Sequence, residues 1–377
     1  MGPRVRRASR RAIYLICAPF IFFVYLCLAR TAQTDAGNLF GPSSDGNKLD
    51  FLMTNSKGLW CQFISHSLKF LREKKSFDNI IYPSGSDNVA LLVAYRGNLA
   101  HFWCIPWTMH MLGPKWKLQI ITRRSEVPLF KSILSEFNMH NNYFLDTFED
   151  LYGYGPWITE LFMRRVQFMV STQFWEGIRG ENILIIQDHG VPLRKWDSPQ
   201  VEPFLHKLFQ YGYAGAPWDL DEDRSPGGNG GFSFRRRSFL MRYAINASVP
   251  VSELLAEQTD LSPVGSKNED GVLGPRLRNH PNGVAPKVLE HQFACEKLLH
   301  PRPMGVHDLP RWHNSTETLS LIIVALQELL EVVNPVVVSS QFEPGYKSWL
   351  RPPWLQPWIE LQERFPGYDL PRECNPV

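Results

Sequence analysis

The sequence predicts an α/β protein whose central sheet is mostly parallel, with helices on both faces. Two uncharged apolar runs, at 89–95 and 182–187, are typical of strands buried on both faces. Helix-length segments lie between such runs, and this alternation of strand and helix is typical of a parallel sheet. The chain has 377 residues, which is enough for one large α/β domain with extensions.

The remaining elements continue the same alternation. The patterns predict two more strands, at 116–122 and 142–147, and helices within 56–74 and at 98–112, 127–137 and 157–178. Gly180 is expected to end the last of these helices, because glycine favours helix C-termini. Ligands of parallel sheets bind beyond the carboxyl ends of the strands, so the loops after Tyr95, Thr122 and Gln187 are expected to form the site.

Beyond residue 190 the patterns predict less regular structure. An apolar helix is expected at 318–333. The tail from Pro335 contains many prolines and is expected to wrap around the core with Trp349, Trp354 and Trp358 as anchors.

The N-terminus predicts a membrane anchor. Residues 12–29 carry no charge and would rise about 27 Å as a helix, enough to cross a thin bilayer. Five arginines precede them, which predicts a cytosolic N-terminus. A cleaved signal peptide is the alternative, but its apolar region is normally shorter. We therefore expect a single-pass type II protein with a cytosolic tail (1–11), a signal anchor (12–29) and a flexible stem (30–57).

Two features suit a lumenal location for the rest of the chain. Asn246 and Asn314 begin glycosylation acceptor triplets. Outside the anchor the cysteine count is even, which permits two disulfides with three connectivities. These cysteines are Cys61, Cys104, Cys295 and Cys374. No two of them are close enough in sequence to indicate a zinc site.

The charge balance excludes a nucleic-acid binder. The chain has a net charge of +3, but residues 12–377 carry 35 basic and 37 acidic side chains. A domain that neutralises many phosphates would be clearly basic.

Three motifs follow the strand at 182–187. Asp188 comes directly after it, where a carboxylate can hold a divalent cation that bridges a diphosphate. The run 227–231 holds four glycines and Asn229, and it is interpreted as a loop whose amides bind anionic oxygens. The basic run 235–237 follows it and is expected to begin a helix. The acid-x-acid triplet at 219–221 is interpreted as part of a solvated acidic loop.

Two further features gain weight from their order along the chain. Glu269 and Asp270 lie in a polar loop, and His307 follows later. An acid pair alone is usually a helix cap, and a lone histidine is usually structural. Here they follow Asp188 and the glycine-rich run in a fixed order.

This order resembles the shared core of the GT-A glycosyltransferases. More closely, the stretches 213–218, 227–236, 268–273 and 305–307 look like a glycosyltransferase-like family with a Gly-Ala-Pro-Trp, Gly-Asn-Gly-Gly-Phe-Ser and Glu-Asp signature. The resemblance implies a GT-A-like catalytic domain over 58–315, followed by a C-terminal extension over 316–377. It implies a lumenal, hexosyltransferase-like enzyme of the Golgi membrane, with the endoplasmic reticulum as the second choice. Such an enzyme would move a sugar from a nucleotide sugar, most simply a UDP-sugar, to a hydroxyl of a glycan, protein or lipid.

The resemblance also implies roles for single residues. Asp270 would be the general base of an inverting reaction, and Glu269 would position donor or acceptor. A divalent cation, Mn²⁺ or Mg²⁺, would be bound by Asp188 and His307. The residues expected to bind the donor are Asp188, Trp218, Gly228, Asn229, Gly230, Gly231 and Arg235. Trp218 and Phe232 are also candidates for stacking on a sugar or a base.

The chain departs from this family after the central strand. The family has a Gln-Thr-Asp-Ser-like stretch there, whereas this chain has Gln187-Asp188-His189-Gly190. His189 is therefore a further candidate ligand, and stabilisation of the leaving group by Arg235, Arg236 and Arg237 without metal is an alternative. The same departure motivates a second hypothesis, a catalytically inactive scaffold that binds nucleotide or glycan. A third is a lumenal interaction protein with a structural glycine loop. A glycosidase is disfavoured, because no suitably spaced acid pair is identified.

Overall fold

The computed structural model describes residues 60–61, 63–73, 77, 87–140, 142–152, 169–218, 226–245, 269–296, 298, 300, 303–307 and 356–369. The chain divides into two compact units, Met1–Thr54 and Asn55–Val377, and every described residue belongs to the second. The predicted anchor, the stem, the glycosylation triplets, the acidic loop at 219–223 and the helix at 318–333 lie outside the described residues. None of the helices in the described ranges is long and apolar enough to span a bilayer.

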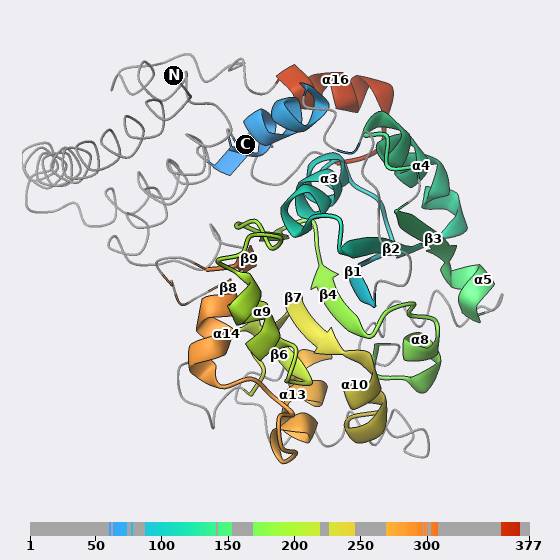
Figure 1. Ribbon diagram of the computed structural model, residues 1–377. Helices are drawn as coiled ribbons and strands as arrows, with labels where there is room; N and C mark the ends of the chain where they lie inside the picture. The colour runs from blue at the N-terminus through green and yellow to red at the C-terminus, as the bar shows by residue number, and fades with distance from the viewer. Residues whose placement is uncertain are drawn as a thin grey trace, which may run out of the picture. The chain divides into compact units, whose positions relative to one another are not determined.

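The protein is a mixed α/β structure built on a mostly parallel sheet of six strands in the order β3-β2-β1-β4-β7-β6 (Figure 1). The first four are β1 (Asn88–Ala94), β2 (Trp116–Thr122), β3 (Tyr143–Thr147) and β4 (Asn182–Ile186), and they pair with one another in parallel. β7 (Asn229–Arg236) runs antiparallel to both β4 and β6 (Tyr213–Ala216). The predicted fold class is therefore confirmed.

The first half of the chain follows the predicted alternation closely. The four parallel strands match their predicted ranges within one residue at each end. The predicted helices at 98–112 and 127–137 correspond to α3 (His101–Leu112) and α4 (Val127–Glu136). Residues 60–61 and 63–73 are helical, as expected within 56–74. Two short elements join these parts, a 3₁₀ turn η1 (Arg124–Glu126) and a one-turn helix α5 (Phe148–Tyr152).

The long helix predicted at 157–178 is wrong in its last part. The short helix α8 (Thr172–Glu176) begins after Ser171, whose backbone is extended, with φ −88° and ψ 147°. Ser171 Oγ accepts a hydrogen bond from the amide of Phe174 at 3.2 Å and caps α8. The serine side chain competes for backbone hydrogen bonds within a helix and favours the N-cap position. The prediction used only the spacing of apolar residues and therefore missed the helix start after Ser171.

The expectation of little regular structure after residue 190 is also wrong. The described residues there form three strands besides β6 and β7, and five helices. The helices are α9 (Glu202–Leu208), α10 (Arg237–Tyr243), α13 (Asp270–Arg278), α14 (Lys287–Phe293) and α16 (Gln356–Arg364). The strands β5 (Gly190–Pro192), β9 (Gly305–His307) and β8 (Ala294–Cys295) form a small second sheet, in which β9 pairs antiparallel with β5 and parallel with β8. Elements this short give no periodic signal over a window of 11 residues.

The glycine-rich run was expected to be a loop, but most of it is strand β7. Within the run only Gly227 and Gly228 have positive φ, 88° and 68°, and they form the turn that leads into the strand. Within β7, a Cβ on Gly230 would overlap with Arg235 and Glu269, and a Cβ on Gly231 would overlap with His307 and Gln187. These glycines are needed because neighbouring side chains crowd both faces of the strand. The helix expected at the basic run begins only at Arg237.

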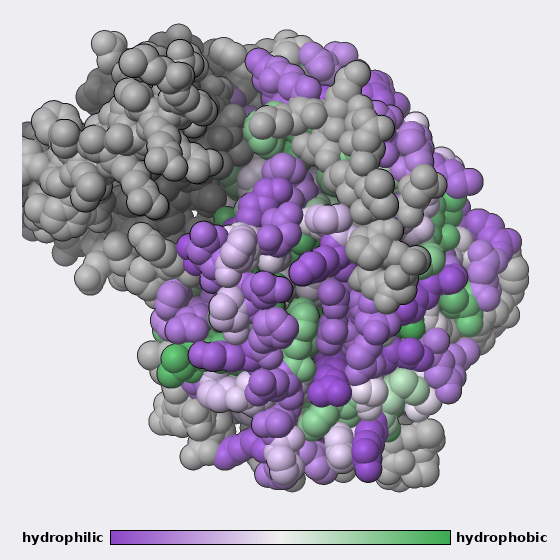
Figure 2. Space-filling model, viewed as in Figure 1, coloured by the Kyte–Doolittle hydropathy of each residue, from purple (hydrophilic) through white to green (hydrophobic). Residues whose placement is uncertain are grey.

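The core lies on both faces of the large sheet. On one face Val89, Leu91, Ile183 and Ile185 pack against side chains of α8, α10 and α13, including Trp175. On the other face Ala90 and Leu92 are also buried. Figure 2 shows hydrophilic residues over most of the described surface on the viewed face, with small hydrophobic areas between them. Among the described residues Val288 is the exposed large hydrophobic side chain, at 73%.

The C-terminal extension packs on the domain through one of the three predicted tryptophans. Trp358 in α16 is fully buried, and its indole Nε1 donates to Ser65 Oγ at 2.8 Å. Arg364 and Arg72 both bind Glu136, with N–O distances of 3.0 and 2.6 Å. In Figure 1 α16 lies beside the helix of residues 60–73. Trp349 and Trp354 lie outside the described residues.

The cysteines do not form the two disulfides that their number permits. Cys104 and Cys295 are buried free thiols. Cys61 is disulfide-bonded, and since the other two described cysteines are free, its partner lies outside the described residues.

Candidate functional site

The candidate site residues lie at the carboxyl edge of the large sheet. The register places the carboxyl ends of β1, β4 and β6 at the same edge as the amino end of the antiparallel β7. Asn98 follows β1, Asp188 and His189 follow β4, and Trp218 follows β6. The described loops therefore bring polar side chains that follow three strands to one edge.

Asp188 and His189 occupy the tip of a tight turn between β4 and β5. The backbone groups of Gln187 and Gly190 bond to each other across this turn, at 3.1 and 3.4 Å. Asp188 Oδ1 lies 2.6 Å from His189 Nδ1, and Asp188 Oδ2 accepts from Asn98 Nδ2 at 2.5 Å. Burial by itself raises the pKa of Asp188, but the hydrogen bonds and the charges of His189 and His101 outweigh it and hold that pKa below its usual range.

His307 on β9 reaches the same place from the small sheet. Its side chain is 8% exposed, and its ring centroid lies 4.8 Å from that of His189. Nε2 lies 3.4 Å from Gln187 Oε1, and Nδ1 lies 3.6 Å from Glu296 Oε1. The structure thus brings Asp188, His189 and His307 together, as the sequence analysis expected of the metal ligands.

These residues do not fit a divalent cation as they stand. Both oxygens of Asp188 already face hydrogen-bonding nitrogens, from Asn98 and His189. Within the described residues no three His, Cys, Asp or Glu side chains converge as a set of metal ligands. Mg²⁺ and Mn²⁺ need several oxygen donors at close range. We therefore derive no catalytic step through a metal.

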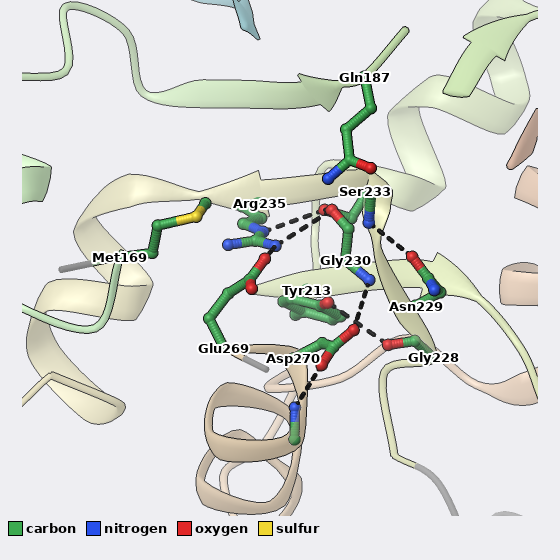
Figure 3. Close-up of polar contacts among 12 residues, drawn as sticks. Met169, Gln187, Tyr213, Gly228, Asn229, Gly230, Ser233, Arg235, Glu269 and Asp270 are labelled. Carbon is green, nitrogen blue, oxygen red and sulfur yellow. Dashed lines mark hydrogen bonds and ion pairs between the residues drawn. The ribbon is translucent and has the colours of Figure 1, made fainter. Parts of the chain in front are cut away.

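A second polar cluster lies under β7 (Figure 3). Arg235 is fully buried and forms an ion pair with Glu269, with 2.8 Å between Nη2 and Oε1. Its guanidinium also donates to the carbonyl oxygen of Gly230 at 3.2 Å and to Ser233 Oγ at 3.0 Å. A lone buried guanidinium would be very costly, so Arg235 and Glu269 depend on each other.

Asp270, the first residue of α13, is the most unusual titratable group of this cluster. Its Oδ2 accepts from the amide of Gly230 at 2.9 Å, and its Oδ1 from the amide of Gly271 at 2.7 Å. The side chain is almost fully buried. Burial, together with the adjacent charge of Glu269, raises the pKa of Asp270 to about 7. Asp270 can therefore hold or release a proton near neutral pH.

Strand β7 separates the two clusters. Successive residues of a strand point to opposite faces. A Cβ on Gly230 would point at Arg235, Glu269 and Asp270, whereas one on Gly231 would point at His307 and Gln187. The predicted base and the predicted metal ligands therefore lie on opposite faces of β7, which the linear order of the motifs did not show.

The predicted donor-binding groups are largely engaged by the protein itself. The amide of Gly230 donates to Asp270, and that of Gly231 donates to Asn229 Oδ1 at 2.6 Å. The carbonyl of Gly228 accepts from the Tyr213 hydroxyl at 3.5 Å. The other two basic residues of the run point elsewhere. Arg236 binds Glu181 at 3.2 Å, and Arg237 Nε donates to the carbonyl of Trp175 at 2.7 Å.

Sequence reasoning missed Glu296, Asn98 and Tyr213. Glu296 is 2% exposed and joins Trp218, Asn229 and His307. Glu296 lies in a segment with no recognisable motif, so its burial was not evident. Asn98 directly follows one of the loops that the strand order singled out, and this position was the signal that could have identified it.

Comparisons with known proteins add the following. A family model described as a protein of unknown function, DUF5672, matches residues 163–307, which include both clusters. No curated protein matches the sequence. Solved structures that match include the apo form of the glycosyltransferase GlyE of Streptococcus pneumoniae TIGR4, at 11% identity and a TM-score of 0.37, over 66% of this chain and 64% of that one. Another is the mannosyltransferase PcManGT of Pyrobaculum calidifontis in complex with GDP-Man and Mn²⁺. It matches at 10% identity and a TM-score of 0.27, over 83% of this chain and 96% of that one. This chain thus spans less than two thirds of GlyE, and both TM-scores are too low to assign a role to any residue.

Proposed function

We propose that the protein is a glycosyltransferase that moves a sugar from a nucleotide-sugar donor, most simply a UDP-sugar, to an acceptor hydroxyl. The observation that carries this proposal is Asp270, a buried acid with a pKa of about 7. It is held by the backbone of the glycine-rich strand at the carboxyl edge of the sheet, where open α/β sheets in general bind their ligands. A general base works best when its pKa lies near the working pH.

In the proposed reaction the acceptor oxygen forms a bond to the anomeric carbon of the donor sugar. The bond from that carbon to the diphosphate oxygen breaks, and the diphosphate leaves with the electron pair. The acceptor oxygen attacks from the face opposite the departing diphosphate, which inverts the anomeric carbon, and Asp270 takes the proton of the acceptor hydroxyl. Glu269 is paired with Arg235, and its charge contributes to the raised pKa of Asp270, which makes Asp270 basic enough to accept that proton.

The cellular setting is a proposal that rests on the sequence alone. Residues 12–29, with the arginines before them, support a type II anchor and a lumenal domain in the Golgi. The lumenal location is tested by the gel mobility of the expressed protein before and after glycosidase treatment. A lumenal domain should change mobility on treatment, and the double variant Asn246→Gln, Asn314→Gln should lose this change. An unchanged mobility in the wild-type protein after glycosidase treatment would contradict it.

The catalytic proposal is tested by thermal unfolding of the full-length protein with nucleoside diphosphates and nucleotide sugars, with and without Mn²⁺. A ligand at 100 times its Kd stabilises the folded state by about 2.7 kcal/mol, which a melting curve detects easily. We expect a selective shift with one nucleotide class, and release of its diphosphate on addition of acceptor glycans. Asp270→Asn should keep the shift and lose the release, whereas the control Glu181→Gln, at the opposite sheet edge, should keep both.

A scaffold that binds nucleotide without turnover is the second candidate. The observation that favours it is Asp188, whose two oxygens are both engaged by neighbouring side chains. A scaffold would show the thermal shift but no diphosphate release from any donor, in the wild type as in Asp270→Asn. The absence of any shift with every nucleotide would contradict both candidates.

A further inference from the structure

Glu296 is a buried carboxylate that ties together three elements at the carboxyl edge. It follows β8 and is 2% exposed. Its Oε2 accepts from the indole Nε1 of Trp218 at 2.7 Å, and its Oε1 accepts from Asn229 Nδ2 at 3.3 Å. Oε1 also lies 3.6 Å from Nδ1 of His307. Glu296 thereby links the segment after β6, the first residue of β7 and the last residue of β9.

The chemistry of these partners requires a carboxylate. The indole nitrogen and the amide nitrogen are both donors, and an ionised carboxylate is the side chain whose two oxygens both accept. A glutamine at 296 could satisfy Trp218 or Asn229 but not both. The side-chain oxygen of Asn229 in turn accepts from the backbone amide of Gly231 at 2.6 Å, so the orientation of the Asn229 side-chain amide is fixed as well.

Trp218 is the aromatic residue that this arrangement holds in place. Phe232, the other residue expected to stack on a ligand, is fully buried and stacks on Phe293, with ring centroids 5.3 Å apart. It belongs to the core and offers no face to a ligand. Trp218 is only half-buried, and its one polar group is already paired. An indole held in this way presents a rigid apolar face.

We propose that Glu296 is a positioning residue that fixes Trp218 as a platform for the apolar face of a sugar ring. This inference rests on the proposed function, which it extends by naming where a sugar is held. Trp218 follows β6, two strands from β4, and strands are spaced about 4.8 Å apart. The axes of β4 and β6 are therefore about 10 Å apart, which gives the lateral separation between the turn of Asp188 and the platform. Sugar units that extend from a diphosphate at β4 span this distance, and the donor sugar and an acceptor glycan share the required apolar face.

The experiment uses the full-length protein labelled with 5-fluorotryptophan and observed by fluorine NMR. The chain has 12 tryptophans, and the resonance missing from Trp218→Phe identifies Trp218. Glu296→Gln is compared with Glu181→Gln, a charge-matched change at the opposite edge. Trp116→Phe, at the amino end of β2, serves as the matched aromatic control. Each protein is titrated with UDP, with UDP-glucose and with free cello- and lacto-oligosaccharides.

We expect Glu296→Gln to move or broaden the Trp218 resonance, and Glu181→Gln to leave it unchanged. A sugar-bearing probe should move the resonance, whereas UDP alone should not. Movement by UDP-glucose assigns the platform to the donor sugar, and movement by a free oligosaccharide assigns it to the acceptor. Trp218→Ala should weaken binding of that probe by at least about fivefold, the lower end of what the loss of one stacking contact costs. Trp116→Phe should leave that binding unchanged.

Three results would overturn the proposal. An unmoved Trp218 resonance in Glu296→Gln would remove the positioning role. A thermal shift with a nucleotide sugar, without movement of the Trp218 resonance by any sugar probe, would remove the platform while leaving the proposed function intact. No binding of any nucleotide or sugar would overturn both. If Glu296→Gln does not fold, Trp218→Phe decides, because unchanged sugar binding in that variant contradicts the proposal.

Discussion

Gly231 in β7 and His307 in β9 are packed so closely that no side chain fits between them. A Cβ on Gly231 would overlap with the imidazole of His307 and would also approach Gln187 Oε1. His307 is itself buried and bordered by Glu296. The imidazole of His307 therefore cannot move away from an added side chain. The absence of a side chain at Gly231 allows the large and the small sheet to approach this closely at the candidate site.

The first prediction follows from this contact. Gly231→Ala should destabilise the protein by about 1–3 kcal/mol, the usual cost of overpacking. The double variant Gly231→Ala, His307→Ala should recover part of this loss, because the imidazole that blocks the methyl group is gone. Chemical denaturation of both single variants and the double variant completes the cycle. Additive losses would show that the two residues do not compete for one space.

The second prediction concerns the buried ion pair. Arg235→Met leaves Glu269 buried without its cation and should cost about 3–5 kcal/mol of unfolding free energy. The comparison is Arg179→Met, which breaks the more exposed pair of Arg179 with Asp146 and should cost about 0–1 kcal/mol. Urea denaturation measures the unfolding free energy of both variants. An equal loss of unfolding free energy in the two variants would mean that the pair of Arg235 with Glu269 is not desolvated.

The third prediction is a pH dependence that Asp270 causes. Its pKa in the folded protein is raised to about 7, above the usual value of 3.8, so the folded state binds the proton more tightly than the unfolded state. The resulting contribution to stability is fully present below about pH 4 and is lost as the pH rises through about 7. Asp270→Asn should remove this part of the slope between pH 4 and 8.

Thermal unfolding across that range measures the slope. Glu363→Gln, on the outer part of α16, changes one acid without changing the buried cluster and serves as the control. If Asp270→Asn and the wild type differ by the same amount at every pH, Asp270 does not carry the raised pKa.

The fourth prediction concerns the C-terminal extension. Trp358→Ala should cost about 3–5 kcal/mol, because a fully buried tryptophan is removed from the contact between α16 and the helix of residues 60–73. Ser65→Ala removes only the hydrogen bond to the indole and should cost about 1 kcal/mol. Limited proteolysis should cut before α16 in Trp358→Ala but not in Ser65→Ala. Early cleavage in both would show that the hydrogen bond, rather than the packing, holds the extension.

The parallel half of the sheet was predictable because its strands are buried on both faces. Runs such as 89–95 and 182–187 carry that burial in their composition, and the strand order then fixes the edge where Asn98 and Asp188 lie. The later elements were not predictable in the same way. β7 looked like a loop because its glycines are required by close contacts with the side chains of Glu269 and His307, which are distant in sequence.

The sequence by itself determined the fold class, the sheet edge at which the candidate residues lie and the residue types gathered there. Only the tertiary structure decided their partners. It set Asp270 and His307 on opposite faces of β7, paired Arg235 with Glu269, and buried Glu296 under Trp218. The physical reason is that burial patterns are local and periodic, whereas the pairing of buried charges depends on which distant segments share the same small volume.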